Sequence, residues 1–95
     1  GQMSAWYILS SLGFYQAEPA NPRFWFGKPA FKNASVKVPG GTFNVTAEDL
    51  SGENRYIQSI TLNGEEYKLP YIEYVDIFRG GNLVFKMGPE QTVWY

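Results

Sequence analysis

The stretch YIQSITLNGEEYKLPYI, residues Tyr56–Ile72, decides the fold class of this chain. It contains two strand-like runs, Tyr56–Leu62 and Glu65–Ile72, separated only by Asn63-Gly64. Asn-Gly between two such runs is the strongest short-range hairpin signal, because both turn residues must adopt positive φ. Pro70 has no N–H to donate, so it indicates that the returning strand is an edge strand or ends there. The stretch therefore predicts an antiparallel hairpin.

Further short strands are predicted on both sides of this hairpin. Arg23–Gly27 is a run rich in aromatic residues, and Ala34–Val38 and Thr42–Glu48 alternate apolar and polar residues on either side of a Pro-Gly-Gly turn. On the C-terminal side, Glu73–Arg79 indicates a single helical turn closed by two glycines, and Asn82–Met87 indicates a last strand. About six short strands spaced by turns predict a mostly β chain, folded as an antiparallel β-sandwich.

The N-terminal stretch Gly1–Tyr15 predicts one helix ahead of the sandwich. Two apolar surfaces run along it, made by Ala5, Ile8, Leu9 and Leu12 and by Met3, Trp6 and Tyr7. Gly13 would end the helix by adopting positive φ. A helix that is apolar nearly all round is a buried one, yet strands follow directly. We therefore expect a piece cut from a larger protein; the alternative is a small domain whose helix packs on one sheet.

Composition excludes several function classes. The chain has 95 residues, with 8 Lys and Arg against 9 Asp and Glu and a net charge of −1, so no basic patch favours nucleic acid. No apolar run approaches the roughly 18 residues that span a bilayer. The sequence has no cysteine and no histidine, which excludes thiol and imidazole catalysis, disulfides and Cys/His zinc sites.

Several short blocks, in order along nearly the whole chain, resemble a known enzyme family. The specific one is Gly1–Tyr7 followed by Leu12–Tyr15. The shorter blocks are Tyr56–Ser59, Leu62–Gly64, Tyr71-Ile72, Asp76-Ile77, Gly80-Gly81, Leu83, Phe85 and Met87–Pro89. Together they are similar to the C-terminal region of glycoside hydrolase family 92, which contains bacterial, calcium-dependent, inverting exo-acting α-mannosidases.

This resemblance implies three segments. Residues 1–15 would be the last helix of a missing catalytic barrel, residues 16–23 a linker, and residues 24–95 a C-terminal β-sandwich domain that packs on the barrel. The family's acidic cluster proposed to hold the general base would lie just upstream of Gly1, so no catalytic and no metal-binding residue is assigned here. Gln2 is the residue expected nearest the substrate in the parent.

The resemblance also implies partners and a location. The parent would bind calcium, which this segment would not hold, and would act on mannose-containing glycans in the periplasm, at the cell surface or outside the cell. The segment's partner would be the rest of the catalytic domain. Cutting the barrel away would expose Met3, Trp6 and Tyr7 of the helix. The helix could then fray, repack on the sandwich or pair with a copy of itself, and of these we expect self-association.

Glycoside hydrolysis needs a pair of carboxylates. The candidate carboxylates lie beside turns or on polar strand faces, where solvated surface charges belong, apart from Asp76, which we expect to cap the helical turn or to contact the backbone. The candidates besides Asp76 are Glu48, Asp49, Glu53, Glu65, Glu66 and Glu73.

Trp25, Trp94 and Tyr95 have two interpretations. They could stack on sugar rings, or they could fill the core or an interdomain contact. The sequence therefore leaves two functions open. The chain is either the structural C-terminal segment of a secreted exo-α-mannosidase, inactive alone, or a stand-alone carbohydrate-binding or protein-interaction module.

Overall fold

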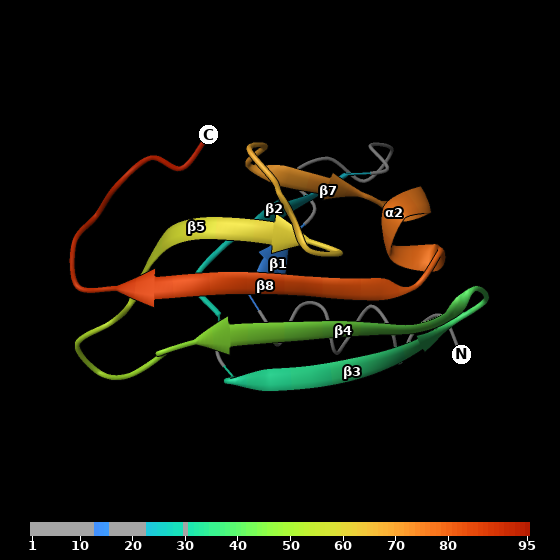
Figure 1. Cartoon of the computed structure of the whole chain (residues 1–95), viewed down its shortest axis with the longest axis horizontal. Coiled ribbons are helices and arrows are strands. Elements are labelled where there is room, and N and C mark those ends of the chain that lie inside the picture. Colours follow the sequence, from blue (N-terminus) through green and yellow to red (C-terminus); the bar gives the residue numbers. More distant parts are fainter. Residues whose placement is uncertain (1–12, 16–22, 30) are drawn as a thin grey trace.

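A computed structural model of the chain describes residues 13–15, 23–29 and 31–95. Among these residues, most of the regular structure is β, and the strands form two sheets, as predicted (Figure 1). The elements in chain order are β1 Phe14–Tyr15, β2 Arg23–Phe26, β3 Asn33–Val38, β4 Gly41–Glu48, β5 Tyr56–Leu62, β6 Glu65–Glu66, β7 Tyr71–Glu73, α2 Tyr74–Phe78 and β8 Gly81–Gly88.

The hairpin at Asn63-Gly64 forms as predicted. Leu62 of β5 pairs with Glu65 of β6, which leaves a two-residue turn. Asn63 and Gly64 have φ values of 54° and 84°, the positive pair that a type I′ turn requires.

The strands β3 and β4 also form the predicted hairpin, with Val38 opposite Gly41. Each β4 residue that alternation places inward is buried: Phe43, Val45 and Ala47. The last strand, β8, then enters the sheet between β4 and β5, which gives the strand order β3-β4-β8-β5-β6. β8 runs antiparallel to β5 but parallel to β4, as the arrows in Figure 1 show. The expectation of a purely antiparallel sandwich is therefore wrong for this one pair.

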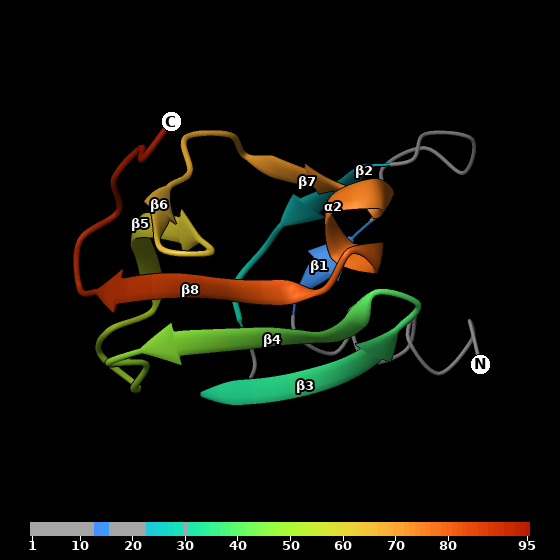
Figure 2. The same ribbon diagram turned by 45° about the vertical axis from the view of Figure 1, so that its right-hand side comes forward.

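The predicted strand Glu65–Ile72 is divided between the two sheets. Only Glu65–Glu66 pairs with β5, whereas Tyr71–Glu73 pairs with β2 in a three-stranded sheet of order β1-β2-β7. Figure 2 shows the chain leaving β6 and crossing to β7. The predicted strand is interrupted before β7, where Pro70 has no N–H to donate to a neighbouring strand. The Pro70 carbonyl still accepts a hydrogen bond from the Phe26 N–H at 3.0 Å.

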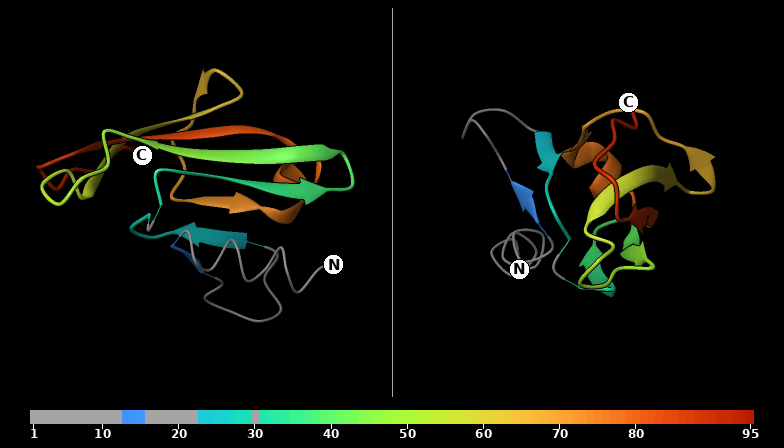
Figure 3. Two further views of the ribbon diagram at one scale, coloured as in Figure 1. Left: turned by 90° about the horizontal axis from the view of Figure 1, so that it is seen from below. Right: turned by 90° about the vertical axis from the view of Figure 1, so that its left-hand side faces the viewer.

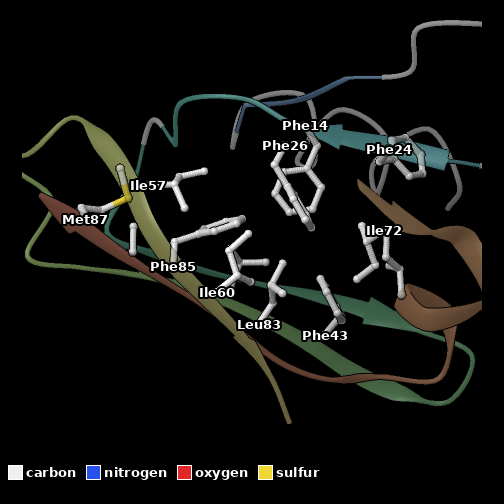
Figure 4. Close-up of a cluster of buried hydrophobic side chains, with 13 residues drawn as sticks. Phe14, Phe24, Phe26, Phe43, Ile57, Ile60, Ile72, Leu83, Phe85 and Met87 are labelled. Atoms are coloured by element: carbon white, nitrogen blue, oxygen red, sulfur yellow. The ribbon is translucent and has the colours of Figure 1, made fainter. Parts of the chain in front are cut away.

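The core lies between the two sheets (Figures 3 and 4). The small sheet contributes Phe14, Phe24, Phe26 and Ile72. The large sheet contributes Phe43, Val45, Ala47, Ile57, Ile60, Leu83, Phe85 and Met87, and α2 contributes Ile77. Edge-to-face ring contacts join the layers, with the Phe26 and Phe85 centroids 5.2 Å apart and those of Phe14 and Phe85 6.0 Å apart.

The boundary of the N-terminal segment differs from the prediction. Phe14 and Tyr15 form β1, which pairs with Phe26 and Trp25 of β2, so these residues belong to the small sheet and not to a helical segment. Gly13 has a φ of 96°, the positive value that was predicted. A Cβ at this position would collide with the carbonyl oxygen of Lys28, which explains why glycine is required. The predicted helix itself, with Met3, Trp6 and Tyr7, lies outside the described residues.

Candidate functional site

The outer face of the small sheet is lined by aromatic residues. β2 alternates, so that Phe24 and Phe26 are buried in the core while Arg23 and Trp25 are half-buried on the opposite face. Because residues directly opposite each other on paired strands share a face, this outer face continues onto β1 and β7.

One row of aromatic side chains crosses all three strands of this sheet. Tyr15 of β1 is paired with Trp25 of β2, which is paired in turn with Tyr71 of β7. The Trp25 and Tyr71 rings lie edge to face with centroids 5.2 Å apart. The guanidinium carbon of Arg23 lies 4.4 Å from the Tyr71 ring centroid, which is a cation–π contact.

The C-terminal tail, residues 89–95, is held beside this face by two side-chain hydrogen bonds. Gln58 lies at a bulge in β5 and donates to the Glu90 carbonyl at 2.6 Å. Further along, the indole N–H of Trp94 donates to the Leu69 carbonyl at 3.3 Å. The tail therefore returns past the loop between β6 and β7 and ends beside the small sheet.

A hollow of about 650 Å³ lies between the tail and the small sheet. Its lining includes Tyr15 and Trp25 from the sheet, Pro70 from the loop, and residues 91–95 from the tail. None of the described residues that line it carries a charged side chain. Its polar groups are a side-chain amide, hydroxyls and indole N–H groups, so the hollow suits a neutral ligand with both apolar and hydroxylated surfaces.

Tyr67 links the two sheets, since its backbone N–H donates to the Ile60 carbonyl of β5 at 2.8 Å. Its hydroxyl donates to the Tyr71 carbonyl at 2.7 Å, and its ring lies edge to face with Phe26 at 6.2 Å. Burial, with smaller contributions from Asp76, Tyr71 and Glu73, raises the pKa of the Tyr67 hydroxyl to about 12. A phenol that stays protonated and bonded to a backbone carbonyl is a structural group.

The acidic residues are dispersed, largely as the sequence predicted. In the part of the chain that the structure describes, no three of them gather into a group that could hold a metal ion. Six of the described acidic residues are exposed, namely Glu48, Asp49, Glu53, Glu65, Glu66 and Glu90. Glu73 is half-buried, which differs from the surface position expected for it.

The predicted capping role of Asp76 is wrong. Asp76 lies inside α2 and pairs with Arg79 at 3.8 Å, while Glu73 occupies the N-cap position without a side-chain capping bond. The helical turn itself ends as predicted, with Gly80 at a φ of 80°.

The structure brings together the three aromatic candidates of the sequence. Trp25, Trp94 and Tyr95 are far apart in the chain, yet all three line the hollow. Sequence reasoning missed Tyr15, because it was assigned to the helical segment; in the structure Phe14 is buried and Tyr15 is exposed on the opposite face of β1. Gln2, the residue expected nearest the substrate, lies outside the described residues.

Among the described residues, no helix has the length and apolar character needed to cross a membrane.

Comparison with known proteins shows to which family the chain is related. The family model for the glycosyl hydrolase family 92 catalytic domain matches residues 1–89. An uncharacterized secreted glycosidase of Arthroderma benhamiae is 31% identical over 98 residues, an alignment that covers 99% of this chain and 13% of that protein.

Solved structures of similar sequence share the fold. The family GH92 inverting mannosidase BT2199 of Bacteroides thetaiotaomicron is 36% identical with a TM-score of 0.82, over 96% of this chain and 12% of that one. The family GH92 α-mannosidase BT3965 of the same organism is 32% identical with a TM-score of 0.81, over 97% and 13%. The family GH92 glycosyl hydrolase ccman5 is 28% identical with a TM-score of 0.84, over 97% and 12%.

The chain thus spans 12–13% of the length of these relatives, while almost all of it takes part in each match. The family match covers well over half of the chain, and the fold agrees with those of the solved relatives. The chain belongs to glycosyl hydrolase family 92.

Proposed function

We propose that this chain is the C-terminal segment of an exo-acting α-mannosidase and that it supports the catalytic domain without catalysing a reaction alone. The observation that carries the proposal is the match to an inverting mannosidase at 36% identity and a TM-score of 0.82 over 96% of the chain. The similar Arthroderma benhamiae protein is described as secreted, which supports placing the parent in the periplasm, at the cell surface or outside the cell.

The chemistry of the described residues supports a structural role. An inverting glycosidase needs a carboxylic acid and a carboxylate about 6.5–9.5 Å apart, one to protonate the leaving group and one to activate water. The described acids lie at turns, on strand edges or in ion pairs such as Glu66 with Lys68 at 2.6 Å. We therefore assign the acid and the base to other parts of the parent.

The same reasoning applies to calcium. A calcium ion takes about six to eight oxygen ligands, usually including several carboxylates. The described residues form no group of three acidic side chains, so they do not fit a calcium site. We assign the calcium of the parent to residues outside those described.

The contribution of the segment would be a rigid, fully packed layer. The large buried side chains from both sheets form one cluster, so the sandwich can act as a solid support against which a neighbouring domain packs. In this proposal, the segment stabilises the parent's catalytic domain through contact with it.

An activity assay tests the proposal. The purified chain is incubated with α-linked mannobioses, with and without calcium, and the release of mannose is measured against a complete family 92 mannosidase as the positive control. We expect no release above the enzyme-free blank, because neither the acid nor the base lies in the segment. Calcium-dependent release of mannose by the chain alone would overturn the proposal.

The encoding gene provides an independent test. We expect its reading frame to extend upstream of Gly1 by several hundred codons and to encode acidic residues immediately before it. A stop codon directly upstream, or an upstream region unrelated to a catalytic barrel, would contradict the assignment to a mannosidase.

A further inference from the structure

We propose that the hollow between the tail and the small sheet binds one or two pyranose rings of a glycan, as a non-catalytic subsite. The choice of mannose-containing glycans as its ligands rests on the proposed function. The site consists of Tyr15, Trp25, Trp94 and Tyr95, with Pro70 at its base.

The first argument is exposure. Tyr15 is 52% exposed and Tyr95 is 58% exposed, while Trp25 and Trp94 are half-buried. Tyr15, Trp25 and Tyr95 do not belong to the core cluster, which Phe14, Phe24 and Phe26 fill from the opposite face of the small sheet, whereas the partly buried Trp94 packs against that cluster. Four large aromatic side chains left around one hollow form a surface that a binding partner can cover.

The second argument is preorganisation. Trp25 is fixed in the central strand of the small sheet and contacts the Tyr71 ring, which also has a cation–π contact with Arg23. The Trp94 ring meets the Tyr95 ring edge to face at 5.1 Å, and its N–H is bonded to Leu69. Aromatic side chains held in this way lose little further conformational entropy when a ligand binds.

The third argument is chemical match. The C–H groups on one face of a pyranose form an apolar surface that packs on an aromatic ring, and its hydroxyls need hydrogen-bond partners at the edge. Gln91 and Thr92 supply such partners beside the rings, together with the hydroxyls of Tyr15 and Tyr95. The absence of charged side chains from the described lining favours a neutral sugar over an anionic ligand.

The volume agrees with this ligand. About 650 Å³ falls within the range of roughly 300–1,000 Å³ found for small-molecule sites. A mono- or disaccharide fits that range, whereas a folded protein partner would need a contact of about 800 Å² on its side. We therefore favour a saccharide over a protein as the occupant.

NMR titration tests the inference on the full chain. The sequence has three tryptophans, so the ¹H–¹⁵N spectrum should contain three indole N–H signals. Addition of methyl α-mannoside or an α-linked mannobiose should shift the signals of Trp25 and Trp94, which Trp25→Phe and Trp94→Phe assign. Binding should be weak, with a dissociation constant of about 1 mM, because the hollow is open to solvent.

Two variants test the aromatic contacts with little risk to the fold. Tyr95→Ala at the chain terminus and Tyr15→Ala at the sheet edge should each weaken binding about two- to tenfold, if a ring–sugar contact contributes as much as a ring–ring contact. Phe31→Ala is the matched control, since Phe31 is also an exposed aromatic residue but does not line the hollow. It should leave the affinity unchanged.

The outcomes distinguish this inference from the proposed function. No indole shift with about 10 mM mannobiose would overturn the subsite and leave the mannosidase assignment intact. Cleavage of mannobiose by the chain would overturn the structural role, while the binding result would stand. If the tyrosine variants lower the melting temperature of the complete parent but leave the affinity of the chain unchanged, the hollow is an interdomain contact and the inference is wrong.

Discussion

Substitution of Asn63 by Ala should destabilise the chain through two separable effects. Asn63 has a φ of 54°, a conformation that costs most L-residues about 1–2 kcal/mol and costs asparagine less. Its side-chain oxygen also accepts a hydrogen bond from the Asn82 N–H at 2.8 Å, while its own N–H donates to the Asn82 carbonyl at 2.7 Å. The side-chain bond therefore ties the β5–β6 turn to the start of β8.

The magnitude follows from these two terms. Alanine adds about 1 kcal/mol of backbone strain relative to asparagine. Loss of the side-chain bond adds about 0.5–1 kcal/mol, in the lower part of the usual range because the bond is exposed. Asn63→Ala should thus cost about 1.5–2 kcal/mol, and Asn63→Gly only about 0.5–1 kcal/mol, since glycine adopts positive φ without strain.

Thermal unfolding followed by circular dichroism measures both variants. For a domain of this size, 1 kcal/mol lowers the melting temperature by about 4–8 °C. Asn33→Ala is the matched control, because Asn33 is an exposed asparagine at the start of the extended strand β3, and it should cost less than about 0.5 kcal/mol. A loss for Asn63→Ala no larger than for Asn63→Gly would refute the argument from backbone strain.

Three further predictions concern the core, the pH dependence and the N-terminal segment. Phe14→Ala should lower the free energy of unfolding in urea by about 3–5 kcal/mol, because the ring is buried between the sheets, and a loss below about 1 kcal/mol would contradict that burial. The pKa of Tyr67 is about 12 in the folded chain against 10.0 unfolded, so the unfolded state releases its proton first. Stability should therefore fall as pH rises from 10 towards 12, and Tyr67→Phe should show a smaller fall in urea unfolding over the same pH range. Replacing Trp6 and Tyr7, which lie outside the described residues, by Ser should shift the chain towards monomer in sedimentation; a wild-type chain that is already monomeric at high concentration would exclude self-association through that stretch.

The candidate site illustrates what composition and pattern can give. The sequence pointed to Trp25, Trp94 and Tyr95 as aromatic candidates and to dispersed acidic residues without a catalytic pair. It could not indicate that the three aromatics share one hollow, because their proximity depends on the return of the tail past Leu69. Nor could it add Tyr15, whose position depends on pairing with Trp25.

What the sequence by itself determined is the local structure. The Asn63-Gly64 turn and the hairpin between β3 and β4 depend on residues close in the chain, where turn geometry and alternation fix the register. The positive φ at Gly13 was also predictable, because glycine adopts it without strain, whereas the approach of Lys28 that excludes a Cβ there depends on the tertiary fold.

Only the tertiary structure decided how the strands are distributed. The insertion of β8 between β4 and β5, parallel to β4, and the passage of the chain from β6 to β7 join segments that no short turn connects. Such pairings depend on which arrangement buries the most apolar surface from both sheets at once. The entropic cost of closing a loop changes only slowly with its length, so it does not select one arrangement over another. Since β8 carries Leu83, Phe85 and Met87 into the core, a central position in the large sheet buries them, and no pattern within β8 itself specifies its neighbours.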